Sequence, residues 1–161
     1  MRLGLVLLAA ALVLPVAATA HVTIAPPFVD AGVATEISLT VPNERPPHAT
    51  VSLEARMPSG ISILSASAPA GWAATVDGST VTWSGGRITG RTEIAFPVRI
   101  EAVVPAGTYR VVARQRYDDG ADVRWTSDLS VLPATSDAAP AERPWPAITA
   151  AVVGIVVIAG S

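Results

Sequence analysis

The chain has 161 residues, a net charge of −2 and no cysteine, which leaves room for one domain with targeting segments. Without a run of Lys or Arg it offers no basic surface to phosphates, so we predict no nucleic-acid partner. The lack of cysteine excludes disulfides, thiolate metal sites and cysteine nucleophiles.

Residues 1–20 have the pattern of a secretory signal peptide. Met1-Arg2 carries a positive charge, an apolar run extends from Leu3 to Val16, and Ala18-Thr19-Ala20 forms a peptidase site of the A-x-A type. An uncleaved anchor is the alternative. Cleavage after Ala20 would make His21 the first residue of the mature chain, so that its α-amine and imidazole Nδ1 can chelate one metal ion.

Apolar and polar residues alternate with a period of two over residues 21–133, which predicts an all-β domain of half-buried antiparallel strands. Seven or more short strands in this length favour an immunoglobulin-like sandwich over an open barrel. The residues predicted to face the core are Val33, Thr35, Ile37, Leu39 and Val41; Val51, Leu53, Ala55 and Met57; Ile94, Phe96, Val98, Ile100 and Ala102; Tyr109, Val111, Ala113, Gln115 and Tyr117; and Val123, Trp125, Leu129 and Val131.

Two Asp-Gly pairs predict β-hairpins within this domain. Asp77-Gly78 separates two alternating runs, and Asp119-Gly120 separates the last two. Asp-Gly is a strong hairpin signal because both central residues of the favoured turn have positive φ.

An Ala- and Pro-rich linker is predicted over residues 134–145, followed by an uncharged hydrophobic tail over residues 146–161 that we expect to form a short helix. A membrane span needs about 20 residues, and no Lys or Arg follows the tail as a cytoplasmic stop. The tail is therefore either a marginal anchor or a truncated transmembrane anchor. In both cases we expect the domain outside the cell, held at the plasma membrane.

The chain has two histidines, His21 and His48. Strand parity directs Val22 and Ile24 to the core and leaves His21 on the polar side. Glu44 is the nearest carboxylate on an irregular segment, and it shares that Pro-bounded segment with His48. A solvated loop charge is the alternative for Glu44, and an exposed turn histidine is the alternative for His48.

Three tryptophans fall on predicted strands. Trp72 and Trp83 are expected in the core, whereas Trp125 follows a turn and is placed where its ring can form the wall of a metal site. An amine and an imidazole with further oxygen donors suit Cu(II), while Zn(II) would prefer a more tetrahedral set.

Several short motifs follow one another along the domain. They are His21-Val22-Thr23-Ile24 with Pro26, Val41-Pro42-Asn43-Glu44, Gly71-Trp72, Thr82-Trp83-Ser84-Gly85-Gly86, Gln115-Arg116-Tyr117-Asp118-Asp119-Gly120, and Trp125. In their order and joint presence they resemble the YcnI-like copper-binding family. The resemblance covers the chain from His21 to about Pro133, although the family's tail is usually longer and followed by basic residues.

The resemblance implies a bacterial extracytoplasmic domain that binds Cu(II) through a single-histidine brace. In such a brace the mature N-terminal amine, the imidazole of the same histidine and a carboxylate bind the metal, with a tryptophan alongside. Carried over by motif, the metal ligands are His21 and Glu44, and the tryptophan is Trp125.

Three functions follow from these observations. The first is Cu(II) binding in copper acquisition, buffering or transfer to membrane copper transport proteins or other envelope copper chaperones. The second is a metal-free interaction or adhesion domain, since a fold does not fix a function. The third, a copper monooxygenase, needs a second imidazole, for which His48 is the sole candidate. No Gly-x-Ser-x-Gly elbow is present, and we predict no catalytic residues and no enzymatic activity.

Overall fold

The computed structural model describes residues 21–134. The predicted signal peptide over residues 1–20 and the predicted tail over residues 146–161 lie outside the described residues, and so does the predicted linker apart from Ala134. Within residues 21–134, no helix is long and apolar enough to cross a membrane.

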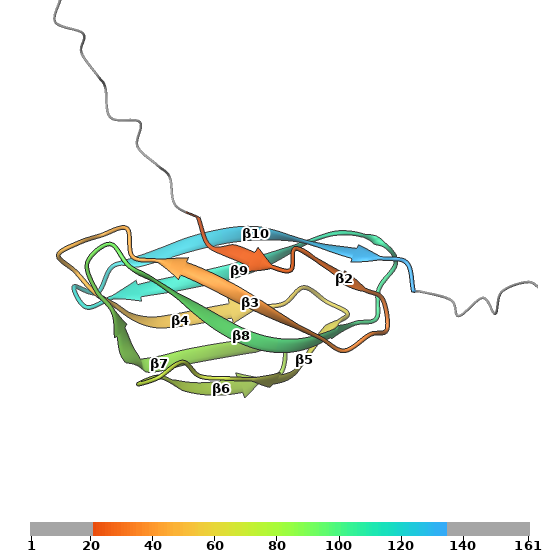
Figure 1. Ribbon diagram of the computed structural model, residues 1–161, viewed down its shortest axis with the longest axis horizontal. Helices are drawn as coiled ribbons and strands as arrows, with labels where there is room; N and C mark the ends of the chain where they lie inside the picture. Colours follow the sequence, from red (N-terminus) through yellow and green to blue (C-terminus); the bar gives the residue numbers. More distant parts are fainter. Residues whose placement is uncertain (1–20, 135–161) are drawn as a thin grey trace, which may run out of the picture.

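Ten strands form two sheets that pack face to face, and this confirms the predicted β-sandwich (Figure 1). The four-stranded sheet has the order β1-β3-β8-β5, and the six-stranded sheet has the order β2-β10-β9-β4-β7-β6. The strands are β1 (Thr23–Ala25), β2 (Phe28–Asp30), β3 (Thr35–Pro42), β4 (Thr50–Arg56), β5 (Ile61–Ala66), β6 (Ala73–Asp77), β7 (Thr80–Ile88), β8 (Glu93–Ala102), β9 (Gly107–Tyr117) and β10 (Asp122–Leu132).

The core lies between the inward faces of the two sheets, where alternate residues of each strand are buried. Ile37, Leu39 and Val41 of β3 face the interior, as predicted, and Val111, Ala113 and Gln115 of β9 do so from the other sheet. Trp72 and Trp83 are both buried against Phe96, with ring centroids 5.0 and 5.2 Å from its ring. The expectation that these two tryptophans belong to the core is confirmed.

The glycine pair after Trp83 has a packing reason. A Cβ added to Gly86 would come within 2.2 Å of the Trp72 indole nitrogen, so no larger residue fits there without moving the ring. The Gly71-Trp72 and Trp83-Ser84-Gly85-Gly86 motifs therefore belong together as a packing arrangement of the core.

The register differs from strict alternation at the start of β4. The pairing of β4 with both neighbours shifts between Thr50 and Ser52: Val51 is an extra residue relative to β9, whereas relative to β7 the extra residues are those between Ser84 and Ile88 on β7 itself. As a result Thr50 is fully buried, whereas Val51, predicted to face the core, is only half-buried. Such a β-bulge changes which side chain faces inward and cannot be read from a period of two.

Two further expectations from the sequence were wrong: one concerns Val33, and the other concerns the direction of strand pairing. Val33 precedes β3 and is exposed, so it does not continue the inward row of Ile37 and Leu39. The sheets are not wholly antiparallel either, because β2 pairs in parallel with β10, with Val29 opposite Val131. This pairing joins the N-terminal segment to the last strand of the domain.

Both predicted hairpins are present, with different turn geometry. β6 and β7 are joined around Gly78, and β9 and β10 around Gly120, at φ values of 58° and 83°. No non-glycine residue among those described has positive φ, so Asp77 and Asp119 do not adopt the left-handed conformation that the Asp-Gly pattern predicts. In each hairpin a single glycine supplies the positive φ.

The two ends of the sandwich differ in chemistry. We call one the charged end; it contains the connections 43–49, 89–92 and 118–121, which carry Glu44, Arg45, Arg91, Asp118 and Asp119. We call the other the apolar end; it contains the apolar connections 31–34 and 103–106 and residues 133–134, where the described chain leaves β10, together with the connections 57–60 and 78–79. Backbone hydrogen bonds close both ends, for example Asp118 to Ala49 and Gly32 to Ala102.

Candidate metal centre

His21 stands at the entrance to β1, on the outer side of the strand. Val22 and Ile24 are buried, while His21 and Thr23 are exposed, as strand parity predicts. β1 pairs with β3, placing Thr23 opposite Thr40. The Ser127 hydroxyl of β10 donates a hydrogen bond of 2.5 Å to the Val22 carbonyl. The backbone next to His21 is thus tied to both sheets.

The structure brings Trp125 against His21. The two ring centroids are 6.1 Å apart and the ring planes meet at 61°, which is an edge-to-face arrangement. Trp125 comes from the middle of β10 and is half-buried, packed against the core with one part of its ring accessible. Trp125, the tryptophan chosen from the sequence, thus lies beside His21.

A buried amide fixes the position of the Trp125 ring. Gln115 on β9 is fully buried, and its Oε1 accepts a hydrogen bond of 2.8 Å from the Trp125 indole nitrogen. Its Nε2 donates to the Pro42 carbonyl at 2.9 Å and to the Thr50 hydroxyl at 2.6 Å. Both ends of the amide are satisfied, so this polar group can be buried without penalty from an unpaired donor.

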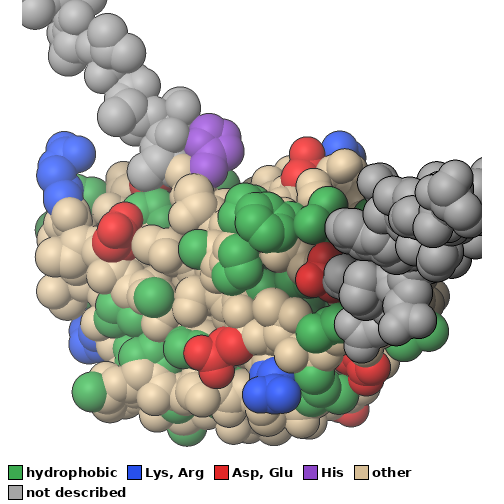
Figure 2. Space-filling model, turned by 45° about the vertical axis from the view of Figure 1, so that its right-hand side comes forward, with side chains coloured by type: hydrophobic (Ala, Val, Ile, Leu, Met, Phe, Trp, Pro, Cys, Tyr) green, Lys and Arg blue, Asp and Glu red, His purple; other side chains and the backbone are tan. Residues whose placement is uncertain are grey.

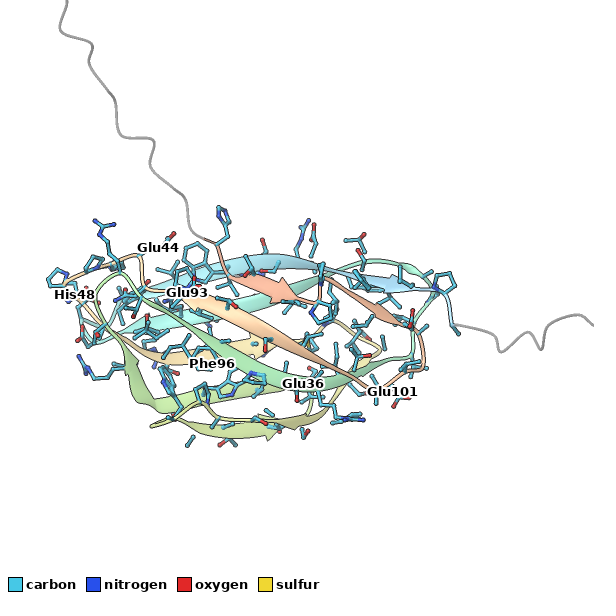
Figure 3. The ribbon with its side chains drawn as sticks, viewed as in Figure 1. Glu36, Glu44, His48, Glu93, Phe96 and Glu101 are labelled. Atoms are coloured by element: carbon cyan, nitrogen blue, oxygen red, sulfur yellow. The ribbon has the colours of Figure 1, made fainter. Side chains whose placement is uncertain are left out.

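Glu44 lies two residues beyond Pro42, on the connection 43–49. It is exposed, and Figure 3 shows it at the charged end of the sandwich together with His48. Asn43, which is buried, organises this connection: its Nδ2 donates to the His48 and Ile88 carbonyls, and its Oδ1 accepts from the Arg45 backbone. Glu44 is thereby held at a fixed point of the loop while its carboxylate stays accessible.

The Tyr117 hydroxyl is buried near Glu44 and has no hydrogen-bond partner of normal geometry. Burial raises the pKa of Tyr117, and the Glu44 carboxylate adds to this effect, which outweighs the opposing influence of the Glu44 backbone and the Thr50 hydroxyl. Tyr117 is therefore neutral at physiological pH, and it places no negative charge beside Glu44.

Among the described residues, one group of three His or carboxylate side chains converges closely enough to hold a metal ion: His48, Asp118 and Asp119. The His48 Nδ1 is 3.3 Å from Asp118, and its Nε2 is 3.6 Å from Asp119. Both carboxylates also pair with guanidinium groups. Arg45 lies 2.7 Å from Asp119, and Arg87 pairs with Asp118.

The electrostatics of this cluster are those of an ion-pair network. Partial desolvation would raise the pKa of Asp118, but the Ala49 backbone, Arg87 and His48 outweigh it and lower the pKa. Hydrogen bonding to the Ala121 backbone is the main cause that lowers the pKa of Asp119, with Arg45 contributing. Two carboxylates face two guanidinium groups, so a divalent cation would have to displace both cations. We interpret the cluster as a clasp between loops.

The structure thus pairs His21 with Trp125 and links the strand that precedes Glu44 to Trp125 through Gln115. His48 is half-exposed, and both its ring nitrogens face aspartates rather than standing free in a turn. Sequence reasoning placed Gln115 inward without giving it a role, and missed the role of Asn43 altogether. A polar residue at an inward position was the available signal for Gln115.

Comparison with known proteins supports the fold and part of the family resemblance. Residues 21–80 match the model of a domain of unknown function, DUF1775, which is the family of the YcnI-like proteins. The comparison with curated proteins gives no match.

Among solved structures, the chain is similar to an uncharacterized protein from Nocardia farcinica with an immunoglobulin-like fold, at 24% identity and a TM-score of 0.63. That likeness covers 71% of this chain and 99% of the other. A cohesin module from a Clostridium perfringens family 33 glycoside hydrolase is similar at 11% identity and a TM-score of 0.50, covering 66% of this chain and 91% of the module. The domain is thus an immunoglobulin-like sandwich.

Proposed function

We propose that this domain is an extracytoplasmic Cu(II)-binding protein whose site is the N-terminus exposed by cleavage after Ala20. The ligands are the α-amine and imidazole of His21 with the carboxylate of Glu44, and Trp125 forms the wall. The observation that carries the proposal is the contact between His21 and Trp125, with the indole held by buried Gln115. The described side chains fit the metal, because two nitrogen donors and one oxygen donor are a set that Cu(II) prefers.

The role that fits such a site is copper handling rather than catalysis. One exposed histidine at the edge of a sandwich leaves the metal accessible for exchange, which suits acquisition, buffering or transfer to membrane copper transport proteins or other envelope copper chaperones. The mature chain has one methionine and no cysteine, and Cu(I) prefers those ligands. We therefore propose that the bound ion is Cu(II), and that the tail over residues 146–161 keeps the domain at the plasma membrane.

The decisive test uses the α-amine. A chain that begins at His21 is compared with the same chain carrying one added Gly before His21, by calorimetry and electron paramagnetic resonance with Cu(II). The extension removes the amine from the histidine chelate, so we expect affinity to fall at least about tenfold, a loss of about 1.4 kcal/mol or more. The copper spectrum should change as one nitrogen ligand is lost.

A chemical version of the test needs no mutation. The sequence contains no lysine, so the only primary amine of a chain that begins at His21 is its N-terminal α-amine. Acylation with an amine-selective reagent should abolish tight binding as the extension does. Glu44→Gln should also weaken binding, whereas Glu36→Gln, at the start of β3 near the apolar end, should not. Equal Cu(II) binding by the free, extended and acylated chains would overturn the brace.

A metal-free interaction domain is the second candidate. The observation that favours it is the likeness in fold to a cohesin module, together with a sandwich that presents loops at both ends. The same titration separates the two functions. No heat and no change in the Cu(II) spectrum with the free His21 chain would favour the interaction domain.

A further inference from the structure

Three neighbouring segments at the apolar end contain no polar side chain, whereas the β4–β5 and β6–β7 connections at the same end carry Ser59 and Ser79. Residues 31–34 read Ala-Gly-Val-Ala, residues 103–106 read Val-Val-Pro-Ala, and residues 133–134 read Pro-Ala. Loops at the surface of a domain are normally polar, as the connections at the charged end are. Three neighbouring apolar segments are therefore not what is expected of a surface that only contacts water.

Large hydrophobic side chains are exposed at the same end. Six such residues are exposed among those described, and four of them lie here: Phe28, Val33, Val103 and Leu132, with 53, 46, 72 and 40% of their surface accessible. We call these four residues the apolar tip. Figure 2 shows hydrophobic side chains gathered beside the point where the described chain passes into the segment drawn in grey.

Backbone pairing places the members of the tip next to one another. β2 runs parallel to β10, with Asp30 opposite Leu132, so Phe28 and Leu132 share the outward face of this sheet edge. Gly32 donates its N–H to the Ala102 carbonyl, which sets Val33 and Val103 side by side on adjoining loops. Beside Val103 lies an open hollow of about 380 Å³, whose lining side chains are all apolar, among them Ala31, Val104 and Pro105.

The chain leaves the domain at the apolar end and continues toward the predicted hydrophobic tail. After Ala134 the sequence has about ten residues before the uncharged run that begins near Trp145. A linker of that length spans at most about 35 Å. The strands of the sandwich, with eleven residues in β9 and β10, extend about 36 Å. The apolar end is therefore the part of the domain that the hydrophobic tail reaches first.

We propose that the apolar tip docks onto the surface of the lipid bilayer, so that the domain stands on the membrane with its charged end outward. This inference rests on the proposed membrane attachment of residues 146–161. Asp30 and Glu101 lie at the margin of the tip, and residues 31–34, 103–106 and 133–134 contain no Lys or Arg. The contact is thus made by apolar side chains entering the interface, without electrostatic attraction to anionic lipid.

The experiment measures depth at two positions of the full chain. Because the chain has no cysteine, Val103→Cys and, at the charged end, Thr89→Cys can each carry one environment-sensitive dye. The labelled chains are reconstituted into phosphatidylcholine vesicles that contain a lipid with a quencher in its acyl chain. We expect strong quenching at position 103 and little at position 89. Adding Val33→Asp should reduce quenching at position 103, and added salt should have no effect.

Flotation of the same vesicles separates the two proposals. A chain that stays free of the vesicles overturns membrane attachment and docking together. A chain that floats with the vesicles but is quenched equally at both positions overturns docking alone. A dye at position 103 with blue-shifted emission but no lipid quenching also overturns docking, because the tip is then covered by the chain's own tail or by a second copy.

Discussion

At the scale of single residues, Gln115 holds the candidate centre together. Its side chain joins β9 to three other strands, through Trp125 of β10, Thr50 of β4 and the Pro42 carbonyl at the end of β3. Because it is fully buried, each of these partners depends on it rather than on water. A buried polar network of this kind is stabilising only when it is complete.

Replacing Gln115 with Leu should lower the free energy of unfolding by about 2–4 kcal/mol, because the Trp125 indole N–H and the Pro42 carbonyl lose their partner in the interior. Urea unfolding followed by tryptophan fluorescence measures this. Arg116→Gln, the exposed neighbour on β9, is the matched control and should change stability by less than about 0.5 kcal/mol. Similar stabilities for the two variants would show that the network contributes little.

The same substitution bears on the proposed copper site. If Trp125 forms its wall, Gln115→Leu should also weaken Cu(II) binding, while Trp125→Phe should weaken it with less loss of stability. Comparing the two variants therefore distinguishes the effect of the Trp125 ring on Cu(II) binding from the effect of its hydrogen bond to Gln115 on stability.

At the scale of elements, the clasp of His48, Asp118 and Asp119 joins the β3–β4 loop to the β9–β10 hairpin, and Arg87 adds the end of β7. Arg45 also lies over the Tyr117 ring at 5.3 Å from its centroid. These contacts connect elements that are far apart in the sequence. They make the loop that carries Glu44 part of a closed structure.

The clasp should make stability depend on acid. The pKa values of Asp118 and Asp119 are lowered in the folded protein. Their contribution is therefore complete above the unfolded value of about 4 and is lost as the pH falls through the folded values. The double variant Asp118→Asn, Asp119→Asn should be less stable than the wild type at pH 7, and the difference should shrink below about pH 4.

Urea unfolding at pH 7, 5, 4 and 3 follows this difference. Asp77→Asn is the control, because Asp77 lies on the hairpin at the opposite end of the sandwich and has no ion pair among the described residues. A stability difference for the clasp variant that stays constant down to pH 3 would contradict the assignment.

The alternation of residues predicted most elements, because side chains on a strand point to opposite faces and the inward ones must be apolar. It placed His21 outside and Val22 inside without any knowledge of tertiary structure. It missed the bulge at Val51 and the exposure of Val33, since both depend on how neighbouring strands end. Trp125 could be chosen by family resemblance, but the clasp could not be predicted, because loop contacts carry no local pattern.

At the scale of the whole molecule, the sandwich has opposite chemistry at its two ends. The charged end carries Glu44 and His48 of the clasp (Figure 3), while the apolar end carries Val103 and the exit of β10. If the tip rests on lipid as proposed, the loop bearing Glu44 stands about 36 Å from the bilayer, the length of an eleven-residue strand. A copper ion bound there would be presented to partners in the surrounding space and would have to be handed down to a membrane protein.

Because β2 pairs in parallel with β10, the N-terminal part of the domain can complete its sheet only after the last strand is available. An exported chain emerges with its N-terminus first. However, Trp125, which lies beside His21, is on β10, and β10 is also the strand that pairs with β2. A chain that ends at Ala121 should therefore show no quenching of tryptophan emission by Cu(II) at low concentration, whereas one that ends at Ala134 should show it. Equal quenching would mean that the histidine acts alone. Under the proposed function, the complete site at His21 can therefore form only after β10, the last strand of the domain, has left the cell.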